Sequence, residues 1–217
     1  MKIVAAVTLA LALGAGSAAA MPPPSRFSAS ITNTWFPLMQ GSRWVYVGMK
    51  DGQPSREVMT VTRKITRIAG VPCATVDDRL WIRGKLAERT TDWYSQDVRG
   101  NVWYVGERTA ELDRSGRVTS TEGTWRLGLH GARAGLFMPA RPRLGQSARQ
   151  EYLKGRAEDR FEVIGLLGAN AVLTQETTPL ERGVVDHKLY VRGIGTVLEQ
   201  TETGGSERNE LVSFTHG

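Results

Sequence analysis

The sequence is poor in the residue types on which the commonest enzyme sites depend. Its 217 residues include one cysteine and three histidines. No two of the histidines, His130, His187 and His216, are spaced as zinc ligands. We also find no nucleophile elbow, no phosphate loop and no dinucleotide fingerprint. We therefore predict neither a metal site nor a cofactor, although an enzyme that lacks these motifs stays open.

A single cysteine also excludes an internal disulfide, so the fold must depend on packing and hydrogen bonds. Cys73 lies in the apolar-leaning segment 71–76. This setting favours a buried, unreactive thiol over a nucleophile.

The first residues have the order of features that is typical of a secretory signal peptide. Lys2 is followed by an uncharged apolar run, residues 3–15, and by small residues that end at Ala20. We expect cleavage before Met21. The alternative is a membrane anchor, but a spanning helix needs about 20 apolar residues, and three prolines follow the run. We predict an exported protein, periplasmic or extracellular, with no transmembrane segment after cleavage.

The net charge is +6, and the basic residues are spread along the chain. A positive surface attracts anionic partners, but solubility is the simpler interpretation. Export argues against nucleic acid as a partner.

From Trp35 onward, short segments rich in Val, Thr, Ile, Trp and Tyr alternate with Gly, Asn and Asp. This spacing is typical of antiparallel strands. We predict a signal peptide (1–20), an extended leader (21–34) and one β-rich domain (35–217). About ten or eleven strands in a meander are expected to curl into a barrel or half barrel.

Two stretches of this meander carry specific expectations. Residues 117–127 are predicted to form one strand. Residues 128–145 contain several glycines and prolines around an apolar patch, Leu136, Phe137 and Met138. We expect this stretch to be a long connection that acts as a lid.

The densest group of polar and aromatic residues is residues 92–107, DWYSQDVRGNVWYVGE. Strand alternation places Asp92 and Tyr94 on one face and Trp93 and Asp97 on the other. Aromatic rings beside Asp92, Asp97 and Glu107 are consistent with a glycan site. Cross-strand aromatic pairing, with Asp97 binding turn amides, is the structural explanation and is the one we favour.

Two further acidic clusters have both a structural and a functional interpretation. Only one of Asp77 and Asp78 can face the interior, and a buried one would have a raised pKa, although a solvated edge is the simpler expectation. Residues 149–152 (RQEY), with the nearby residues 157–159 (AED), either line a cavity mouth, with Arg149 as an anion partner, or form strand surface.

Several of these segments resemble a family of exported bacterial proteins that has no assigned activity. The resemblance is carried by FPL at 36–38, the 92–107 segment, GARAGLFMP at 131–139, RQEY, AED and GIG at 193–195. It implies export and a single β-rich domain, and it supplies no catalytic residues. A weaker, architectural likeness links the chain to envelope carriers of lipids and lipoproteins.

We predict first a non-catalytic binder of a hydrophobic or amphiphilic small molecule or envelope lipid, in a mostly apolar cavity. Its ligand-binding residues would be Trp93, Trp103, Leu136, Phe137, Met138 and Arg149. The second hypothesis is a glycan-active enzyme that uses Asp92, Asp97 or Glu107. The third is a structural or interaction module that presents a sheet edge to a protein.

Overall fold

The computed structural model describes residues 20–217; residues 1–19, and with them nearly all of the predicted signal peptide, lie outside the described residues. The fold is mainly β, and every strand pairing is antiparallel. The prediction of fold class is confirmed. Within the described residues, no helix has the length and apolar content needed to cross a membrane.

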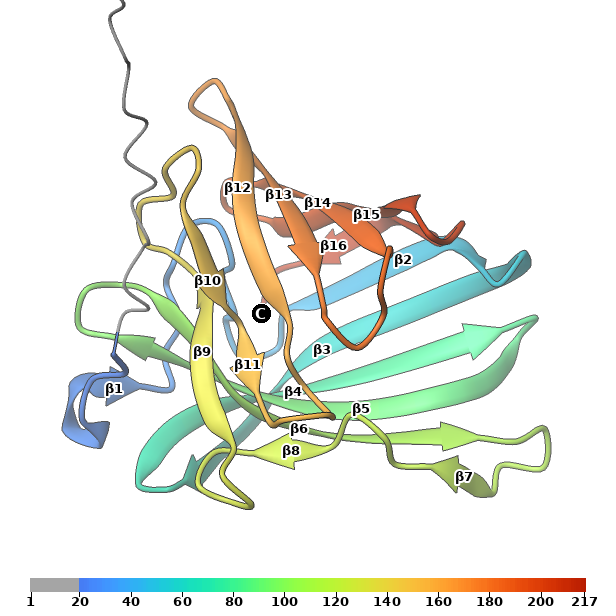
Figure 1. Ribbon diagram of the computed structural model, residues 1–217, viewed down its shortest axis with the longest axis horizontal. Coiled ribbons are helices and arrows are strands. Elements are labelled where there is room, and N and C mark those ends of the chain that lie inside the picture. Colours follow the sequence, from blue (N-terminus) through green and yellow to red (C-terminus); the bar gives the residue numbers. More distant parts are fainter. Residues whose placement is uncertain (1–19) are drawn as a thin grey trace, which may run out of the picture.

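Thirteen strands follow one another around a single sheet (Figure 1). In this order they are β10 (Ser147–Arg149), β12 (Arg160–Leu167), β13 (Ala171–Thr177), β14 (Val185–Val191), β15 (Gly195–Thr203), β16 (Arg208–Thr215), β2 (Arg43–Lys50), β3 (Gln53–Ile68), β4 (Val71–Ile82), β5 (Lys85–Asp97), β6 (Val102–Leu112), β9 (Arg133–Met138) and β11 (Glu151–Tyr152).

The two ends of this sheet meet at one short segment of chain. Only Gln150 separates β10, which pairs with β12, from β11, which pairs with β9. The sheet is therefore nearly closed into a barrel. Three short strands lie off this path: β1 (Phe27–Ser28) pairs with β5, and β7 (Val118–Ser120) and β8 (Trp125–Arg126) pair with β6. A single turn of 3-10 helix, η1 (Pro24–Arg26), precedes β1.

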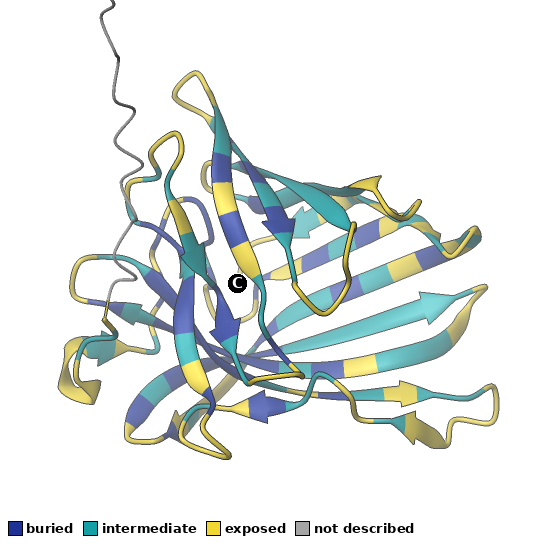
Figure 2. Cartoon of the chain, viewed as in Figure 1, coloured by how far each residue is buried: buried dark blue, intermediate teal, exposed yellow. Residues whose placement is uncertain are grey.

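Tight turns set the register of the longest strands. Asp51-Gly52, Ala69-Gly70 and Arg83-Gly84 are the two-residue turns that follow β2, β3 and β4, and all six residues have positive φ. Turns of this kind match the twist of the paired strands. Figure 2 shows the resulting alternation of buried and exposed residues along β12, where Phe161 and Val163 point inward.

The structure corrects three details of the predicted meander. Residues 128–145 are not a long connection or a lid, because β9 lies within them and forms part of the barrel wall beside β6. Residues 117–127 divide into β7 and β8, since the turn at residues 121–124 interrupts the pairing with β6. The strands are also more numerous than ten or eleven.

Residues 31–38, which we call the floor segment, close one end of the barrel. Asn33 anchors this segment, because its Nδ2 donates to the carbonyls of Gly100 and Pro139 and its Oδ1 accepts from the backbone of Trp35. Next to the end of β14, the Gly193 amide donates to the Thr34 carbonyl of the floor segment. The segment thus joins the ends of β5, β9 and β14.

The floor segment also brings the main hydrophobic cluster into this end of the barrel. Ile31, Phe36 and Leu38 are buried there with Trp44, whose Nε1 donates to the carbonyl of Ile194. Cys73 belongs to a smaller cluster with Val71 and Trp93. Burial raises the pKa of the Cys73 thiol to about 12, so the prediction of a buried, unreactive thiol is confirmed.

Candidate functional site

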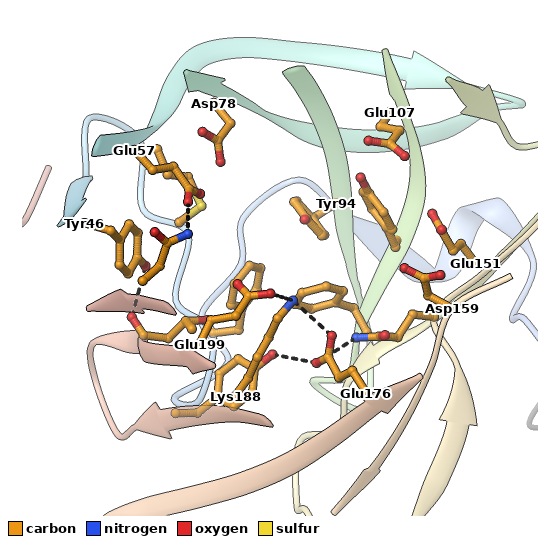
Figure 3. A pocket seen from close by; sticks show the side chains of 18 residues that line it. Tyr46, Glu57, Asp78, Tyr94, Glu107, Glu151, Asp159, Glu176, Lys188 and Glu199 are labelled. Carbon is orange, nitrogen blue, oxygen red and sulfur yellow. Dashed lines mark hydrogen bonds and ion pairs between the residues drawn. The ribbon is translucent and has the colours of Figure 1, made fainter. Parts of the chain in front are cut away.

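Carboxyl side chains ring the interior of the barrel above the floor segment. We define this carboxylate belt by eight residues: Glu57, Asp78, Asp92, Glu107, Glu151, Asp159, Glu176 and Glu199. They come from β3, β4, β5, β6, β11, the connection to β12, β13 and β15. Figure 3 shows most of them around one cavity, with Asp78 and Glu107 across from Lys188 and Glu176.

The belt surrounds two adjoining chambers. The inner chamber has a volume of about 260 Å³ and the outer one about 280 Å³, and they share Glu57, Asp78, Tyr94, Glu107 and Glu199 among their walls. Eleven of the 22 acidic residues line the two chambers, against three of the 28 basic ones. A chain with a positive net charge therefore encloses a strongly acidic interior.

One wall of the belt carries its own counterion. Lys188 of β14 lies between Glu176 and Glu199, with its Nζ 3.0 Å from Glu176 Oε2 and 3.3 Å from Glu199 Oε1. Burial alone would lower the pKa of Lys188, but the two carboxylates raise it well above its ordinary value. Gln150 Nε2 and the Tyr190 hydroxyl donate to the other oxygen of Glu176. This wall is electrostatically satisfied.

The wall formed by β3 to β6 has no such cation. No basic group of the described residues lies within 4 Å of the carboxylates of Glu57, Asp78, Asp92 or Glu107. Burial raises the pKa of each: that of Asp92 to about 7 and those of Asp78 and Glu107 well above their ordinary values. Burial without a counterion therefore disfavours the charged forms of these acids.

Glu151 joins the two walls, and one of its oxygens is left without a partner. The residue is only 6% exposed, and its Oε2 makes no hydrogen bond. Burial, and then the charge of Asp159, raises the pKa of Glu151 to about 8. The nearby indole of Trp125 acts in the opposite direction and lowers the pKa of Glu151. Trp125 Nε1 is likewise buried and makes no hydrogen bond. A buried oxygen without a donor is costly.

Aromatic rings line the lower part of the inner chamber. Tyr94 and Tyr104 stack with centroids 4.7 Å apart, and Phe36 and Phe137 lie 4.6 Å apart beside them. The Tyr104 hydroxyl donates to Asp92 Oδ1 at 2.5 Å. These rings, Phe36, Tyr94, Tyr104 and Phe137, form what we call the aromatic base of the chamber, meaning its lower surface. The site thus combines this aromatic surface with carboxyl groups above it.

A bulge in β6 turns Glu107 into the chamber. Strict alternation places Glu107 on the face opposite to Tyr104, but Val105 and Gly106 together oppose Trp93, which shifts the register by one residue. Gly106 has φ +153°, and a Cβ there would lie 2.8 Å from the Trp125 carbonyl oxygen. Glycine at this position therefore allows Glu107 to lie opposite Asp92.

Most of the side chains predicted to bind ligand lie outside the two chambers. Phe137 lines the inner one. Trp93 packs with Val71 and Val105, and Trp103 packs against Phe27, with ring centroids 6.1 Å apart.

The other residues predicted to bind ligand also make contacts outside the two chambers. Leu136 and Met138 are buried in the main cluster, and the Arg149 guanidinium stacks over Tyr152 at 4.2 Å. The expected mostly apolar cavity is also wrong, because carboxyl groups dominate its upper wall.

The structure separates the three candidate catalytic carboxylates. Asp92 and Glu107 are cross-strand neighbours that face the same chamber. Asp97 is buried at the β5–β6 turn, where it accepts from the amides of Arg99 and Asn101 and from Trp103 Nε1. The structural interpretation of Asp97 is confirmed, and Asp97 is removed from the candidate catalytic set.

In each of the other two acidic clusters, some residues line the chambers and others do not. Asp78 lines both chambers, whereas Asp77 pairs with Arg79 at 3.8 Å, so only one of the two acids faces inward, as predicted. The expectation that this cluster is a solvated edge is wrong. From the RQEY and AED segments, Gln150, Glu151 and Asp159 line the inner chamber.

Sequence reasoning did not single out Lys188, Glu176, Glu199 or Glu57. Each lies in a predicted strand, but alternation alone does not tell which face is interior. A charged residue at an inward position is indistinguishable from a solvated one until the pairing around the barrel is known.

The belt does not have the geometry of a metal site. Among residues 20–217, no group of three or more His, Cys, Asp or Glu side chains is arranged to hold a metal ion. Its carboxylates come from strands around the circumference of the barrel.

No protein-family model matches the chain, and no curated protein matches it. Among solved structures, the fold is similar to that of a putative lipoprotein from Parabacteroides distasonis, with 9% sequence identity and a TM-score of 0.42. The similarity covers 84% of this chain and 99% of that one. A likeness at this level assigns no function, and the resemblance to an exported family stays a prediction.

Proposed function

We propose that this protein is an exported, non-catalytic binder of an amphiphilic molecule whose head is an organic cation, an ammonium or a guanidinium. The head would lie in the carboxylate belt and the apolar part on the aromatic base. The observation that carries the proposal is the belt itself: eight carboxyl groups face one cavity whose inner chamber contains a single basic residue, Lys188.

The electrostatics of the empty belt favour a cationic ligand. Buried carboxylates without counterions are costly, and burial accordingly raises the pKa values of Asp78, Asp92 and Glu151, which disfavours their charged forms. A ligand ammonium would provide the charge that Lys188 supplies on the opposite wall. Binding should therefore displace protons from groups such as Asp92 and Glu151.

The shape and lining of the cavity support an amphiphile of small size. The two chambers, about 260 and 280 Å³, together fall within the roughly 300–1,000 Å³ that is usual for small-molecule sites. Aromatic faces such as that of Tyr94 attract cations as well as apolar groups. A purely hydrophobic ligand would leave the belt unpaired.

Calorimetric titration with n-octylamine at pH 7, with n-octanol as the neutral control, tests the proposal. We expect octylammonium to bind at least 10-fold more tightly than octanol. The binding enthalpy should vary with the ionisation enthalpy of the buffer, because protons are released. Equal affinity for the two compounds would overturn the proposal.

Substitutions in the carboxylate belt test whether its residues bind octylammonium. Asp78→Asn/Asp92→Asn should weaken octylammonium binding by about 10-fold or more, since two anionic partners are lost. The matched control, Glu122→Gln/Glu162→Gln, removes two exposed carboxylates and should leave the affinity unchanged. Mass spectrometry of an organic extract of the purified protein would then identify a natural ligand.

A glycan-active enzyme is the second candidate, favoured by the placement of Asp92 and Glu107 on neighbouring strands of one chamber. A pKa of about 7 for Asp92 suits a general acid. It ranks second because such a pair needs one ionised carboxylate, and the pKa of Glu107 is raised as well. If the protein hydrolysed chromogenic glycosides and Glu107→Gln abolished this activity, the glycan-active enzyme would become the first candidate.

The third hypothesis, an interaction module with an open sheet edge, has the least support. A partner strand needs an extended row of free backbone groups. The strands at the two ends of the sheet, β10 and β11, are three and two residues long.

A further inference from the structure

A second concave site lies on the outside of the barrel and has the opposite charge. This outer groove, of about 510 Å³, is bounded by β6, β8, the connection after β8 and the residues that follow β11. These elements lie together at the lower edge of the view in Figure 1. Its apolar lining residues are Leu129, Leu153 and the buried Trp125, and its basic ones are Arg108, Arg126, Lys154 and Arg156.

The four cations of the groove have no anionic partners. No ion pair within 4 Å and no side-chain hydrogen bond involves Arg108, Lys154 or Arg156 among residues 20–217. Arg126 is oriented by stacking over Trp93, with its Cζ 4.8 Å from the ring centroid, and it too lacks an acidic partner.

Nothing in the lining of the groove compensates for these charges. Glu107 is the only acidic residue in this lining, and burial, which raises its pKa well above its ordinary value, disfavours its charged form. Some other cations of the chain do have acidic partners, as with Arg117 and Asp113 or Lys50 and Glu207. The groove brings four cations without acidic partners together with an exposed apolar residue, Leu129, around one hollow.

We propose that the outer groove is an independent site for an amphiphilic anion, a carboxylate or phosphate monoester on a short apolar chain. The guanidinium groups of Arg108, Arg126 and Arg156 would bind the anionic head through charge-assisted hydrogen bonds, for which their planar forks are suited. The chain would cover Leu129, which is 52% exposed, and the half-buried Leu153. This ligand class is excluded from the acidic chambers by charge.

Calorimetric titration with octanoate, octyl phosphate and inorganic phosphate at low ionic strength tests the site. We expect at least one of the two amphiphiles to bind, and inorganic phosphate to bind at least 10-fold more weakly than octyl phosphate. The preferred amphiphile identifies the head group. Equal binding of inorganic and octyl phosphate, or no binding of either amphiphile, would overturn the proposal.

Two double variants locate the binding. Lys154 and Arg156 are exposed, so Lys154→Gln/Arg156→Gln should keep the native thermal melt and weaken amphiphile binding by about 10-fold. The matched control, Arg63→Gln/Lys64→Gln, removes an exposed basic pair from β3 and should change nothing. Equal losses in the two variants would show a general charge effect and contradict the proposal.

The same variants separate this site from the carboxylate belt. Octylammonium binding should be unaffected by Lys154→Gln/Arg156→Gln, and octanoate binding should be unaffected by Asp78→Asn/Asp92→Asn. Failure of one ligand class therefore leaves the other site testable.

Discussion

The two walls of the carboxylate belt hold their buried acids in different ways. On the wall of β13 to β15, Lys188 contacts Glu176 and Glu199 at 3.0 and 3.3 Å, and the charges are balanced within the protein. On the wall of β3 to β6, the acids from Glu57 to Glu107 share no cation, and burial raises their pKa values. The first wall is complete as it stands, and the second is neutral only while it holds protons. The first wall therefore resembles a structural ion-pair network, and the second is the wall to which we assign the ligand in the proposed function.

Removing the cation of the satisfied wall should have the largest effect. Lys188→Met would leave Glu176 and Glu199 buried without their counterion. Breaking such a pair costs about 3–5 kcal/mol. Urea unfolding at pH 7 should show a loss of this size.

The double variant Lys188→Met/Glu176→Gln is the control for this prediction. It removes one of the two stranded charges and should recover about 1–2 kcal/mol. If Lys188→Met cost less than about 1 kcal/mol, Lys188 would not balance the charges of its wall, and the two walls would not differ in this respect.

Asp97 and Asp92 lie five residues apart on β5. A variant of Asp97 separates its role in the turn from the proposed role of Asp92 in ligand binding. Asp97→Ala removes the acceptor of two backbone amides and of the buried Trp103 Nε1. Hydrogen bonds to a charged group contribute about 1.5–3 kcal/mol each, and we expect a net loss of about 2–3 kcal/mol in thermal or urea unfolding. Octylammonium affinity should not change. A large loss of affinity would place Asp97 in the site, against its position at the turn.

The fold was predictable from the sequence because local signals agreed with one another. Turns such as Asp51-Gly52 and the alternation along residues 92–97 specify hairpins without any knowledge of the rest of the chain. Strand β9 was missed because Gly135 and the surrounding glycines and prolines conceal a strand whose pairing is non-local.

The site was less predictable because it depends on closure of the barrel. Glu57 and Lys188 lie on strands far apart in the sequence, and which side of each strand faces inward follows only from the sheet order. The inward position of Glu107 depends on the bulge at Gly106. The segments that carry the family resemblance nevertheless include Phe36, Asp92, Glu151 and Asp159, all on the chamber walls.

The raised pKa values of the buried acids make the stability of the protein depend on pH. The pKa values of Asp92 and Glu151 are raised in the folded state, to about 7 and about 8. The folded protein therefore binds more protons than the unfolded chain above about pH 4, so these groups favour folding at low pH and lose that contribution as pH rises through their folded pKa values. The pKa of Lys188 is raised instead, so its contribution persists across this range.

Thermal unfolding should show this dependence. Between pH 5.5 and pH 8.5 we expect the free energy of unfolding to fall by at least about 2 kcal/mol, the contribution of Asp92 alone, or roughly 5 °C or more in Tm. Saturating octylammonium should reduce the dependence, because the ligand replaces the protons. Stability that rises with pH over this interval would contradict the electrostatic description of the β3 to β6 wall.

Glu151→Gln should have the smallest effect on stability and tests the site most directly. An amide resembles the protonated carboxyl that the folded protein holds near neutral pH, so the variant should unfold within about 1 kcal/mol of the native protein at pH 6. At pH 8.5, where the native carboxyl ionises at a cost, the variant should be the more stable one. Octylammonium should bind it about 5- to 10-fold more weakly, because the unpaired Oε2 no longer offers a negative charge. The exposed Glu162→Gln serves as the control, with both properties unchanged. An affinity for octylammonium equal to that of the native protein would show that Glu151 belongs to the architecture of the barrel and not to its ligand site.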